Sequence, residues 1–427
     1  MIRSTNYISN FFSRFLIVLV FMGVETSIVA QPKSQHGVLD SRSFSLEHDK
    51  LALNGDWGYF ENQFVQPIDA FSLRSSFIEF PNVWNKTNKS GQGYATYCLK
   101  VILAKQTDSL AIEMPQVYSS YQLWVNGKLI GVNGKVGKTL AETVPQWLPQ
   151  TVAFSNSSDT LEIVLQISNF NHHKGGIKDP IYLGSSELLK YQHSIAFGSN
   201  ITESILLGTV GIIFLVLYLN TKKKKIIIYF ALFCITWAIR GMFSNLYTFI
   251  SFYPDFNWNV MVKIEYITLF LTMIWGILFL GRVLVKETNK SIKYLLVGSN
   301  VFFIIYALIM SPALFTKGLP IYLSFSGFLI IYSTILILKA LINERLGAGF
   351  LTVSILLGIC IFSYDIFTYE GFFTHYPIIF SVGYILIFSL MAVVLLLHLN
   401  IIKSKPRASN RLTFDDLYNG DNSLTKL

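Results

Sequence analysis

The stretch ITESILLGTVGIIFLVLYL, residues 201–219, decides the fold, and about six more long apolar runs follow it up to residue 400 with short polar breaks. An apolar run of roughly 18 residues crosses ~30 Å of hydrocarbon as a helix, which satisfies its own backbone hydrogen bonds in lipid. The second half of the chain therefore predicts an all-α bundle of seven transmembrane helices. The expected spans are 201–219, 226–249, 262–281, 292–310, 320–338, 346–368 and 378–399.

The composition agrees with a membrane protein. Of 427 residues, 52% are hydrophobic and 14% are charged, and the mean hydropathy is +0.47. This is too apolar for an ordinary soluble enzyme. The net charge of +9 arises in the membrane half: residues 31–199 hold 14 basic and 14 acidic side chains, whereas residues 200–427 hold 18 and 10. The excess charge thus reports topology, and we expect no nucleic-acid partner.

The basic residues predict the orientation. Alternate loops and the C-terminal tail hold 15 of the 18 Lys and Arg of the membrane half. Basic loops stay in the cytoplasm, so we expect a multi-pass membrane protein with an N-terminal half outside the cytoplasm and a cytoplasmic C-terminus. The opposite loops carry aromatic residues typical of the interface. These loops contain Phe252, Tyr253, Phe256 and Trp258, and Phe372, Phe373 and Tyr376.

Residues 1–30 resemble a secretory signal peptide. Arg3 and Arg14 precede a short apolar core at residues 15–24, and small residues surround Ala30. The core is short for a span, so we expect cleavage after Ala30, with an uncleaved anchor as the alternative. In both cases the next segment is exported.

Residues 43–183 show short alternating runs separated by Gly, Asn, Pro and Asp, which is typical of an antiparallel all-β domain. Asn126-Gly127 predicts a two-residue hairpin that places Tyr121, Leu123 and Val125 on one face. The number of short strands favours a jelly-roll or sandwich. The expected strands are 96–103, 110–114, 121–125, 128–132 and 160–168.

Several motifs in this half carry a family resemblance. They are LNGDWGY at 53–59, PNVWN at 81–85, GYATY at 93–97, WVNG at 124–127 and SNFNHHKGGI at 168–177. In this order they resemble the sugar-binding, galactose-binding-like jelly-roll of family 2 glycoside hydrolases. They are still more similar to the ectodomain of bacterial seven-transmembrane receptors with diverse intracellular signalling modules. No catalytic barrel follows, so the resemblance implies a fold and a binding role without hydrolase chemistry.

The receptor resemblance implies a location in the bacterial inner membrane, with the N-terminal half in the periplasm, and a division of the chain into input and membrane parts. Receptors of this family usually continue into an output module, but here only about 28 residues follow Leu399, too few to bury a core. We therefore expect output through a separate cytoplasmic signalling protein. The expected parts are a signal peptide at 1–30, a periplasmic β jelly-roll sensor at 31–184, a juxtamembrane helix at 185–200, a seven-helix domain at 201–400 and a short tail at 401–427.

Charged residues inside the expected spans need an explanation, because charge is costly in lipid. Arg240 and Asp365 lie ~21 Å and ~28 Å along their helices from the cytoplasmic side, and Lys263 and Glu265 begin the third span from outside. All four fall at similar depth. The functional hypothesis pairs Arg240 with Glu265 or Asp365 in a network that rearranges on ligand binding. The alternatives are a fixed structural pair or separate snorkelling to the interface.

Candidate ligand contacts lie in the β half. His172 and His173 are flanked by Asn169 and follow a strand end where jelly-roll ligands dock, and Trp84 and Tyr94 could stack on a sugar. Core packing and loop closure are the alternative roles for these five residues. Adjacent histidines on a strand point to opposite faces, so they form a poor metal site.

We expect no enzymatic activity, bound metal or cofactor. No phosphate loop, nucleophile elbow or HExxH is present, and of three cysteines only Cys98 lies in the β half. We therefore expect a membrane signal-input receptor for a small molecule or carbohydrate. The alternatives are a membrane transporter and a non-signalling scaffold that binds a glycan or an envelope protein. A homodimer is compatible with the sequence.

Overall fold

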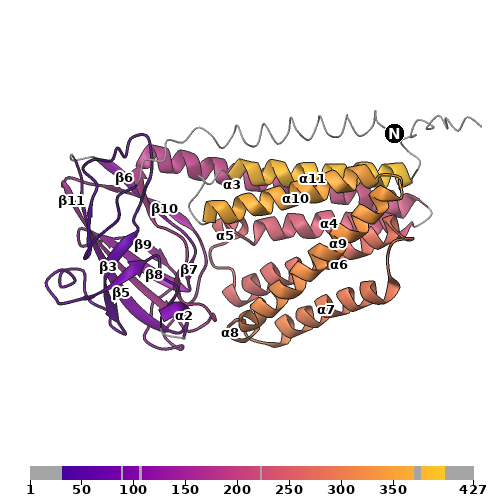
Figure 1. The fold of residues 1–427 in the computed structure, drawn as a ribbon. Coiled ribbons are helices and arrows are strands. Elements are labelled where there is room, and N and C mark those ends of the chain that lie inside the picture. The colour runs from indigo at the N-terminus through magenta and orange to yellow at the C-terminus, as the bar shows by residue number, and fades with distance from the viewer. Residues whose placement is uncertain (1–30, 88–89, 105–107, 222–223, 370–376, 400–427) are drawn as a thin grey trace, which may run out of the picture.

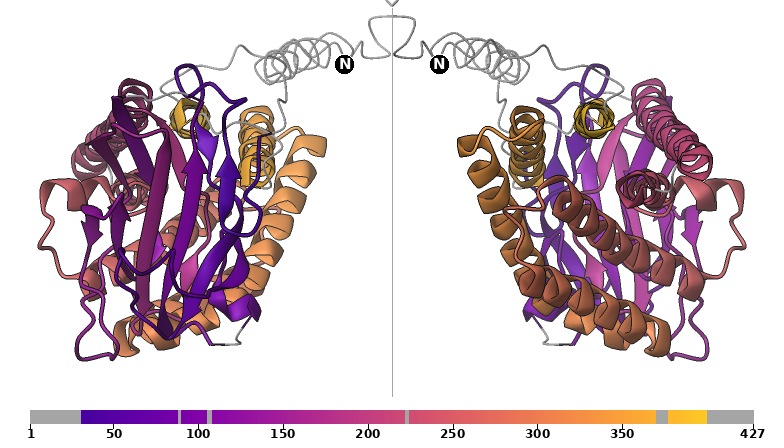
Figure 2. Two further views of the ribbon diagram at one scale, coloured as in Figure 1. Left: turned by 90° about the vertical axis from the view of Figure 1, so that its left-hand side faces the viewer. Right: turned by 90° about the vertical axis from the view of Figure 1, so that its right-hand side faces the viewer.

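The structure, a computed structural model, describes residues 31–87, 90–104, 108–221, 224–369 and 377–399. The expected signal peptide and C-terminal tail lie outside these residues, as do Lys222, Lys223 and the aromatic residues of the 370–376 loop. The described chain forms a β region, residues 31–185, followed by a helical region, residues 186–399 (Figure 1). Viewed along the helices, the β region covers one end of the bundle (Figure 2). We call this the β-side end and the opposite one the far end.

The β region contains two main sheets that enclose a common apolar core. The larger sheet has the strand order β4 (Ser76–Phe80), β3 (Gly55–Glu61), β5 (Gly93–Ile102), β11 (Thr160–Asn169), β8 (Ser120–Val125) and β9 (Lys128–Asn133), with β1 (Val38–Asp40) parallel to β5. The smaller sheet has the order β10 (Gln150–Ser155), β6 (Ser109–Met114), β13 (Tyr182–Ser185) and β2 (Leu51–Ala52). A two-stranded pair of β7 (Val117–Tyr118) and β12 (Gly176–Ile177) and the short helix α2 (Trp84–Thr87) complete the region.

The predicted β8–β9 hairpin is confirmed. Asn126 and Gly127 have φ angles of 48° and 76°, the left-handed values that a two-residue turn of this kind requires. Tyr121, Leu123 and Val125 are buried in the core between the sheets. The alternation of side chains along β8 therefore fixes which face of the larger sheet turns inward.

Large aromatic side chains fill the space between the sheets. The ring of Trp57 stacks on Phe80 with centroids 4.2 Å apart, and its indole Nε1 donates to the Leu53 carbonyl at 2.9 Å. Leu183 from the smaller sheet belongs to the same buried cluster. Each such side chain contributes about 2–3 kcal/mol through burial. Cys98 lies on the outer face of the larger sheet, where Val65 and Ala70 pack against it, and burial raises the pKa of this free thiol to about 11.

The helical region begins with α3, which runs without a break from Ser186 to Asn220. Of the described helices, six are long and apolar enough to cross a membrane, counting Pro312–Ile342 as one, and Ala348–Ile361 is a shorter apolar helix within α10. Helix α3 packs against both α4 and α11. The other elements are α4 (Lys225–Met242), α5 (Thr248–Phe252), α6 (Trp258–Val283), α7 (Lys290–Ile309), α8 (Pro312–Phe315), the 3-10 turn η1 (Thr316–Gly318), α9 (Leu319–Ile342), α10 (Ala348–Tyr369) and α11 (Pro377–His398).

The second expected span, 226–249, was too long. Helix α4 ends at Met242, and the chain turns through Asn245 and Tyr247, whose φ angles of 58° and 49° are left-handed, before α5 begins. Asparagine accepts this conformation more readily than most residues. Apolar and aromatic residues recur through residues 243–249, so hydropathy did not reveal the turn. Their aromatic rings lie in a cluster between α4, α5 and α6.

Candidate functional site

Three of the five ligand candidates from the sequence lie in the interior. Trp84 is buried and its Nε1 donates to the Tyr97 hydroxyl at 2.6 Å. Asn169 is fully buried, and its Nδ2 donates to the carbonyls of Gly91, His172 and Lys174 at 2.6, 2.8 and 2.9 Å. This amide therefore closes the loop after β11.

His172, the third buried candidate, lies in that loop. Only 2% of its surface is exposed, and burial lowers the pKa of the imidazole to about 3, although a hydrogen bond with the Lys174 backbone acts in the opposite sense. The ring is therefore neutral at physiological pH. Its Nε2 has no hydrogen-bond partner among the residues that the structure describes.

The other two candidates are half-buried. The ring of Tyr94 lies 4.8 Å from that of Phe64, and the backbone N–H of His173 donates to the Thr316 hydroxyl at 3.3 Å. Burial lowers the pKa of His173, with the charges of Lys317 and Lys174 acting in the same direction. His173 thus lies where the β region meets η1, and the five candidates do not gather around one cavity.

The β region contacts the helices through aromatic side chains. His172 stacks on Tyr118 with centroids 4.8 Å apart and planes within 2°, and it meets the edge of Trp147 at 5.2 Å. On the other side, Trp147 contacts Tyr247 at 5.8 Å and Trp258 at 5.3 Å. We call Tyr118, Trp147, His172, Tyr247 and Trp258 the aromatic junction. Trp147 has 1% of its surface exposed and belongs to the same buried cluster as helix residues.

Polar contacts hold Trp147 in this position. The Nδ2 of buried Asn133 donates to the carbonyls of Gln146 and Leu148, at 3.3 and 3.4 Å, and so fixes the backbone on both sides of the indole. The Gln146 side chain in turn donates to the Pro254 carbonyl, between α5 and α6, at 2.5 Å. The loop before β10 is therefore tied to the β region and to the helices.

Polar side chains of α4 and α6 lie next to Tyr247 of the aromatic junction. The Tyr247 hydroxyl donates to the Glu265 carboxylate at 3.3 Å. The guanidinium Nη1 of Arg240 donates to the backbone carbonyl of Glu265 at 2.8 Å. The junction is thus connected to α4 and α6 through the two residues that the sequence singled out.

The other two residues of the expected charge network lie apart from this contact. The Lys263 ammonium donates to the Leu308 carbonyl in the last turn of α7 at 2.7 Å, where a helix end favours a cation. Asp365 belongs to α10, and its side chain lies outside the described residues.

Sequence reasoning missed a further buried carboxylate. Glu203 in α3 has 6% of its surface exposed and accepts hydrogen bonds from Trp237 Nε1, at 3.0 Å, and from the Ser381 hydroxyl. It therefore connects α3 with α4 and α11. The rule that singled out Arg240 also applies to Glu203, because it lies inside the first expected span.

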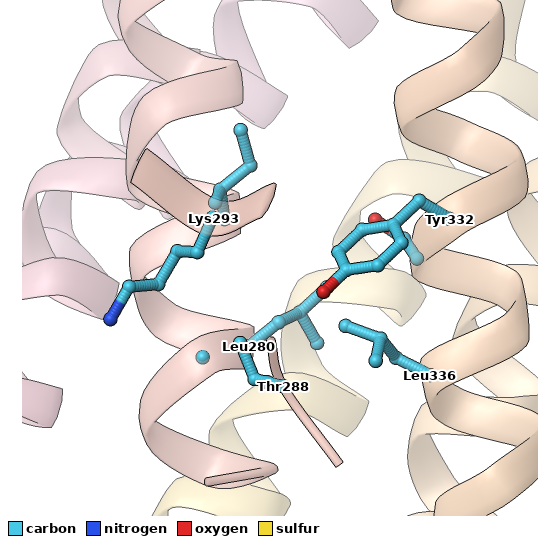
Figure 3. Close-up of a pocket in the computed structure, with 8 residues that line it drawn as sticks. Leu280, Thr288, Lys293, Tyr332 and Leu336 are labelled. Atoms are coloured by element: carbon cyan, nitrogen blue, oxygen red, sulfur yellow. The ribbon is translucent and has the colours of Figure 1, made fainter. Parts of the chain in front are cut away.

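The far end is held differently. Arg345 Nε donates to the Glu287 carboxylate at 2.6 Å, joining the loop after α6 to the loop after α9. Beside this pair, between α6, α7 and α9, lies a cavity of about 10 Å³ lined by Leu280, Thr288 and Tyr332 (Figure 3). That volume holds about one water molecule, so this cavity is no site for a metabolite.

The described side chains include no group of three His, Cys, Asp or Glu that could hold a metal ion. What the aromatic junction provides is a mechanical connection between loops of the β region and buried polar groups of α4 and α6. The geometry thus defines a multi-pass membrane protein with a β-sheet region packed on one end of its helices.

Residues 203–402 match the family described as 7TM diverse intracellular signalling, which confirms the family resemblance for the helical half. A comparison with curated proteins finds no match.

Several solved structures are similar to part of this chain. They include the family 2 β-galacturonidase from Eisenbergiella tayi bound to galacturonate, with 15% identity, and β-glucuronidases from Ruminococcus gnavus and Faecalibacterium prausnitzii, with 11% and 14% identity. Each match covers 32% of this chain, at a TM-score of 0.24. The chain covers 24%, 28% and 31% of these proteins, respectively. We base no inference on likenesses of this size.

Proposed function

We propose that this protein is a signal-input receptor of the bacterial cytoplasmic membrane. In this proposal a jelly-roll sensor, residues 31–184, binds a small molecule or carbohydrate in the periplasm. Seven spans, with α10 as one of them, relay the signal to a separate cytoplasmic protein. The match of residues 203–402 to a signalling family supports the membrane part, and the alternating basic loops support the orientation.

The observation that carries the proposal is the aromatic junction. A binding domain attached by a loose linker would pass little strain to the membrane. Here Trp147 lies buried among rings of the helical region, and one of those rings, Tyr247, donates to Glu265. The juxtamembrane part of α3 also continues into the first span without a break. Two rigid connections therefore link the β region to the helices.

A transport function is disfavoured by the helix geometry. Transporters commonly bind substrate where helices are interrupted near the midplane of the bilayer. Pro312, Pro320 and Pro377 occur instead in the first turns of α8, α9 and α11. A proline there costs little, because the first turn has no hydrogen-bond partner for its amide. We propose no catalytic role.

The test uses the full chain in lipid nanodiscs. A glycan array and a small-molecule thermal-shift screen identify a ligand, and hydrogen exchange is then measured with and without it. We expect changed exchange in the β region and also in residues 240–268, across the junction. A ligand that changes exchange only in the β region would support the non-signalling scaffold instead. A reporter fused after Leu427 and active in the periplasm would contradict the orientation.

A further inference from the structure

A groove of about 380 Å³ lies where the β8–β9 hairpin, the ends of β6 and β10, and the first turns of α3 meet. Figure 1 shows β6, β10 and the beginning of α3 together at this corner of the β region. The volume is in the range of small-ligand sites. The groove is separate from the loop that carries His172 and His173. It is lined by Ser109, Lys128, Leu129, Ile130, Ala153, Phe154, Ser155, Ser186 and Lys190.

The charge of the groove has one sign. Lys128 from β9 and Lys190 from α3 line it, and no carboxylate is among its lining residues. Within the described part of the chain, neither ammonium group forms an ion pair. Two positive charges that share a groove attract an anion, and added salt screens this attraction.

The rest of the lining combines hydroxyl groups with an apolar wall. Ser109, Ser155 and Ser186 supply hydroxyls that donate or accept hydrogen bonds. Leu129, with 45% of its surface exposed, and the partly buried Phe154 supply apolar surface. Such a lining fits a molecule with hydroxyl groups, an apolar face and a negative charge.

We propose that this groove binds a hydroxylated organic anion of monosaccharide size, with its carboxylate or phosphate held between Lys128 and Lys190. The anion joins a lysine of the β region to a lysine of α3. Next to Lys190, buried Leu189 packs over Gly184 of β13, so this turn of α3 already rests on the smaller sheet. A bound anion fixes the angle at which α3 leaves the sheet.

The proposed anion would be the ligand class of the proposed receptor, so this part of the inference rests on the proposed function. Helix α3 continues from the groove to Glu203, which accepts hydrogen bonds from α4 and α11. A change in the angle of α3 therefore reaches the helices at that carboxylate. Binding itself is measured without any signalling output.

The experiment compares three probes on the full chain in nanodiscs by isothermal titration calorimetry: D-glucuronate, D-glucose 6-phosphate and neutral D-glucose. The test variant is Lys128→Ala with Lys190→Ala. The matched control is Lys135→Ala with Lys138→Ala, which removes the same charge from exposed lysines of the β region. We expect at least one anionic probe to bind, with affinity falling at least tenfold in the test variant and less than twofold in the control. Affinity should also fall as salt rises.

Binding of glucuronate alone identifies a carboxylate ligand, and binding of glucose 6-phosphate alone identifies a phosphate. Equal binding of glucose, equal losses in both variants, or binding of neither anion would overturn the proposal. Thermal unfolding of each variant confirms that it is folded. If the anion binds but hydrogen exchange does not change beyond α3, the groove stands and the receptor function fails. If another ligand changes hydrogen exchange across the junction while these anions do not bind, the receptor function stands and the groove proposal fails.

Discussion

Different contacts join the chain segments at the two ends of the helical bundle. At the β-side end, five rings from both regions bury one another, and Trp147 and Trp258 are almost completely covered. At the far end, one ion pair between Arg345 and Glu287 joins two loops beside a cavity of about 10 Å³. Ionic screening does not weaken the burial of rings, whereas it does weaken an ion pair with a partly exposed partner, which also responds to pH.

The contrast indicates where the molecule can change shape. The aromatic junction cannot slide continuously, because close-packed rings have few alternative arrangements. Any change of shape that passes through it must therefore move the ring cluster as a unit or repack it. At the far end, the loops after α6 and α9 are joined by the Arg345–Glu287 ion pair and by a hydrogen bond from Asn343 to Glu287. The two ends can be tested separately by substitutions that remove one kind of contact at a time.

The largest effect is expected from Trp147→Ala. Removing a fully buried Trp typically costs about 3–5 kcal/mol, and the lost contacts here are those between the two regions. We expect faster hydrogen exchange in residues 134–149 and 243–262 and a lower unfolding temperature. The core between the sheets should keep its protection.

The matched control for this substitution is Trp124→Ala. Trp124 is half-buried on the outer face of the larger sheet, next to the Cys98 cluster. The Trp124→Ala substitution should destabilise the β region without changing hydrogen exchange in residues 243–262. Equal exchange at the junction in the two variants would show that Trp147 does not hold the regions together.

A second prediction concerns the intramembrane contact. Arg240→Glu removes the donor to the backbone carbonyl of Glu265, and we expect a loss of about 2 kcal/mol because a hydrogen bond from a charged group is lost. Adding Glu265→Arg should not restore stability, because the carbonyl still lacks its donor and Tyr247 then faces a cation.

The measurement is thermal unfolding of both variants in nanodiscs. Tyr247→Phe with Glu265→Gln forms a double-mutant cycle that reports the hydroxyl–carboxylate contact. Recovery of wild-type stability in the charge swap would instead establish a simple pair between the side chains of Arg240 and Glu265.

Much of the local structure followed from the sequence, because its signals are periodic. Alternating apolar residues predicted strands within β5, β6, β8, β9 and β11, and Asn126-Gly127 predicted the turn. Apolar length predicted most of the membrane helices. These patterns depend on near neighbours in the chain, so one sequence is enough to read them.

The site was harder to predict, because its contacts are distant in sequence. Trp147 lies in a loop with no period, and its neighbours Tyr247 and Trp258 are about a hundred residues away. No local pattern marks such a contact. Glu203 was within reach of the rule for charged residues in spans. The groove at Lys128 and Lys190 could not be predicted from the sequence, because only the folded chain brings the β8–β9 hairpin and α3 together.

The far end gives a third prediction. Arg345→Ala leaves the Glu287 carboxylate, which is 4% exposed, without its cation and should cost about 1–3 kcal/mol. Lys339→Ala, at an exposed lysine near the same end, is the control. Burial raises the pKa of Glu287, but the hydrogen bond and charge of Arg345 outweigh this and hold the pKa below its ordinary value of 4.5.

A carboxylate with a lowered pKa in the folded protein stabilises it above its unfolded pKa. The contribution of the Arg345–Glu287 pair is therefore complete above about pH 4.5 and is lost as the pH falls through the folded value. Unfolding temperatures at pH 7 and pH 4 should differ less in Arg345→Ala than in wild type. An unchanged difference would show that the pair contributes little.

The smallest expected effect is the pH response of the aromatic junction. His172 has a folded pKa of about 3, against an ordinary value of 6.5, so the unfolded chain binds its proton first as the pH falls. Stability from the neutral ring is complete above about pH 6.5 and decreases toward pH 3, with a loss on the order of 1 kcal/mol by pH 5.5. Nearby Lys174 and half-buried His173 add positive charge, which also opposes protonation of His172.

Hydrogen exchange of the junction should accelerate between pH 7 and pH 5.5 after correction for intrinsic rates. His172→Phe keeps a ring against Tyr118 and should show less acceleration, whereas His173→Gln should behave as wild type; identical pH responses in the two variants would assign the effect to another group.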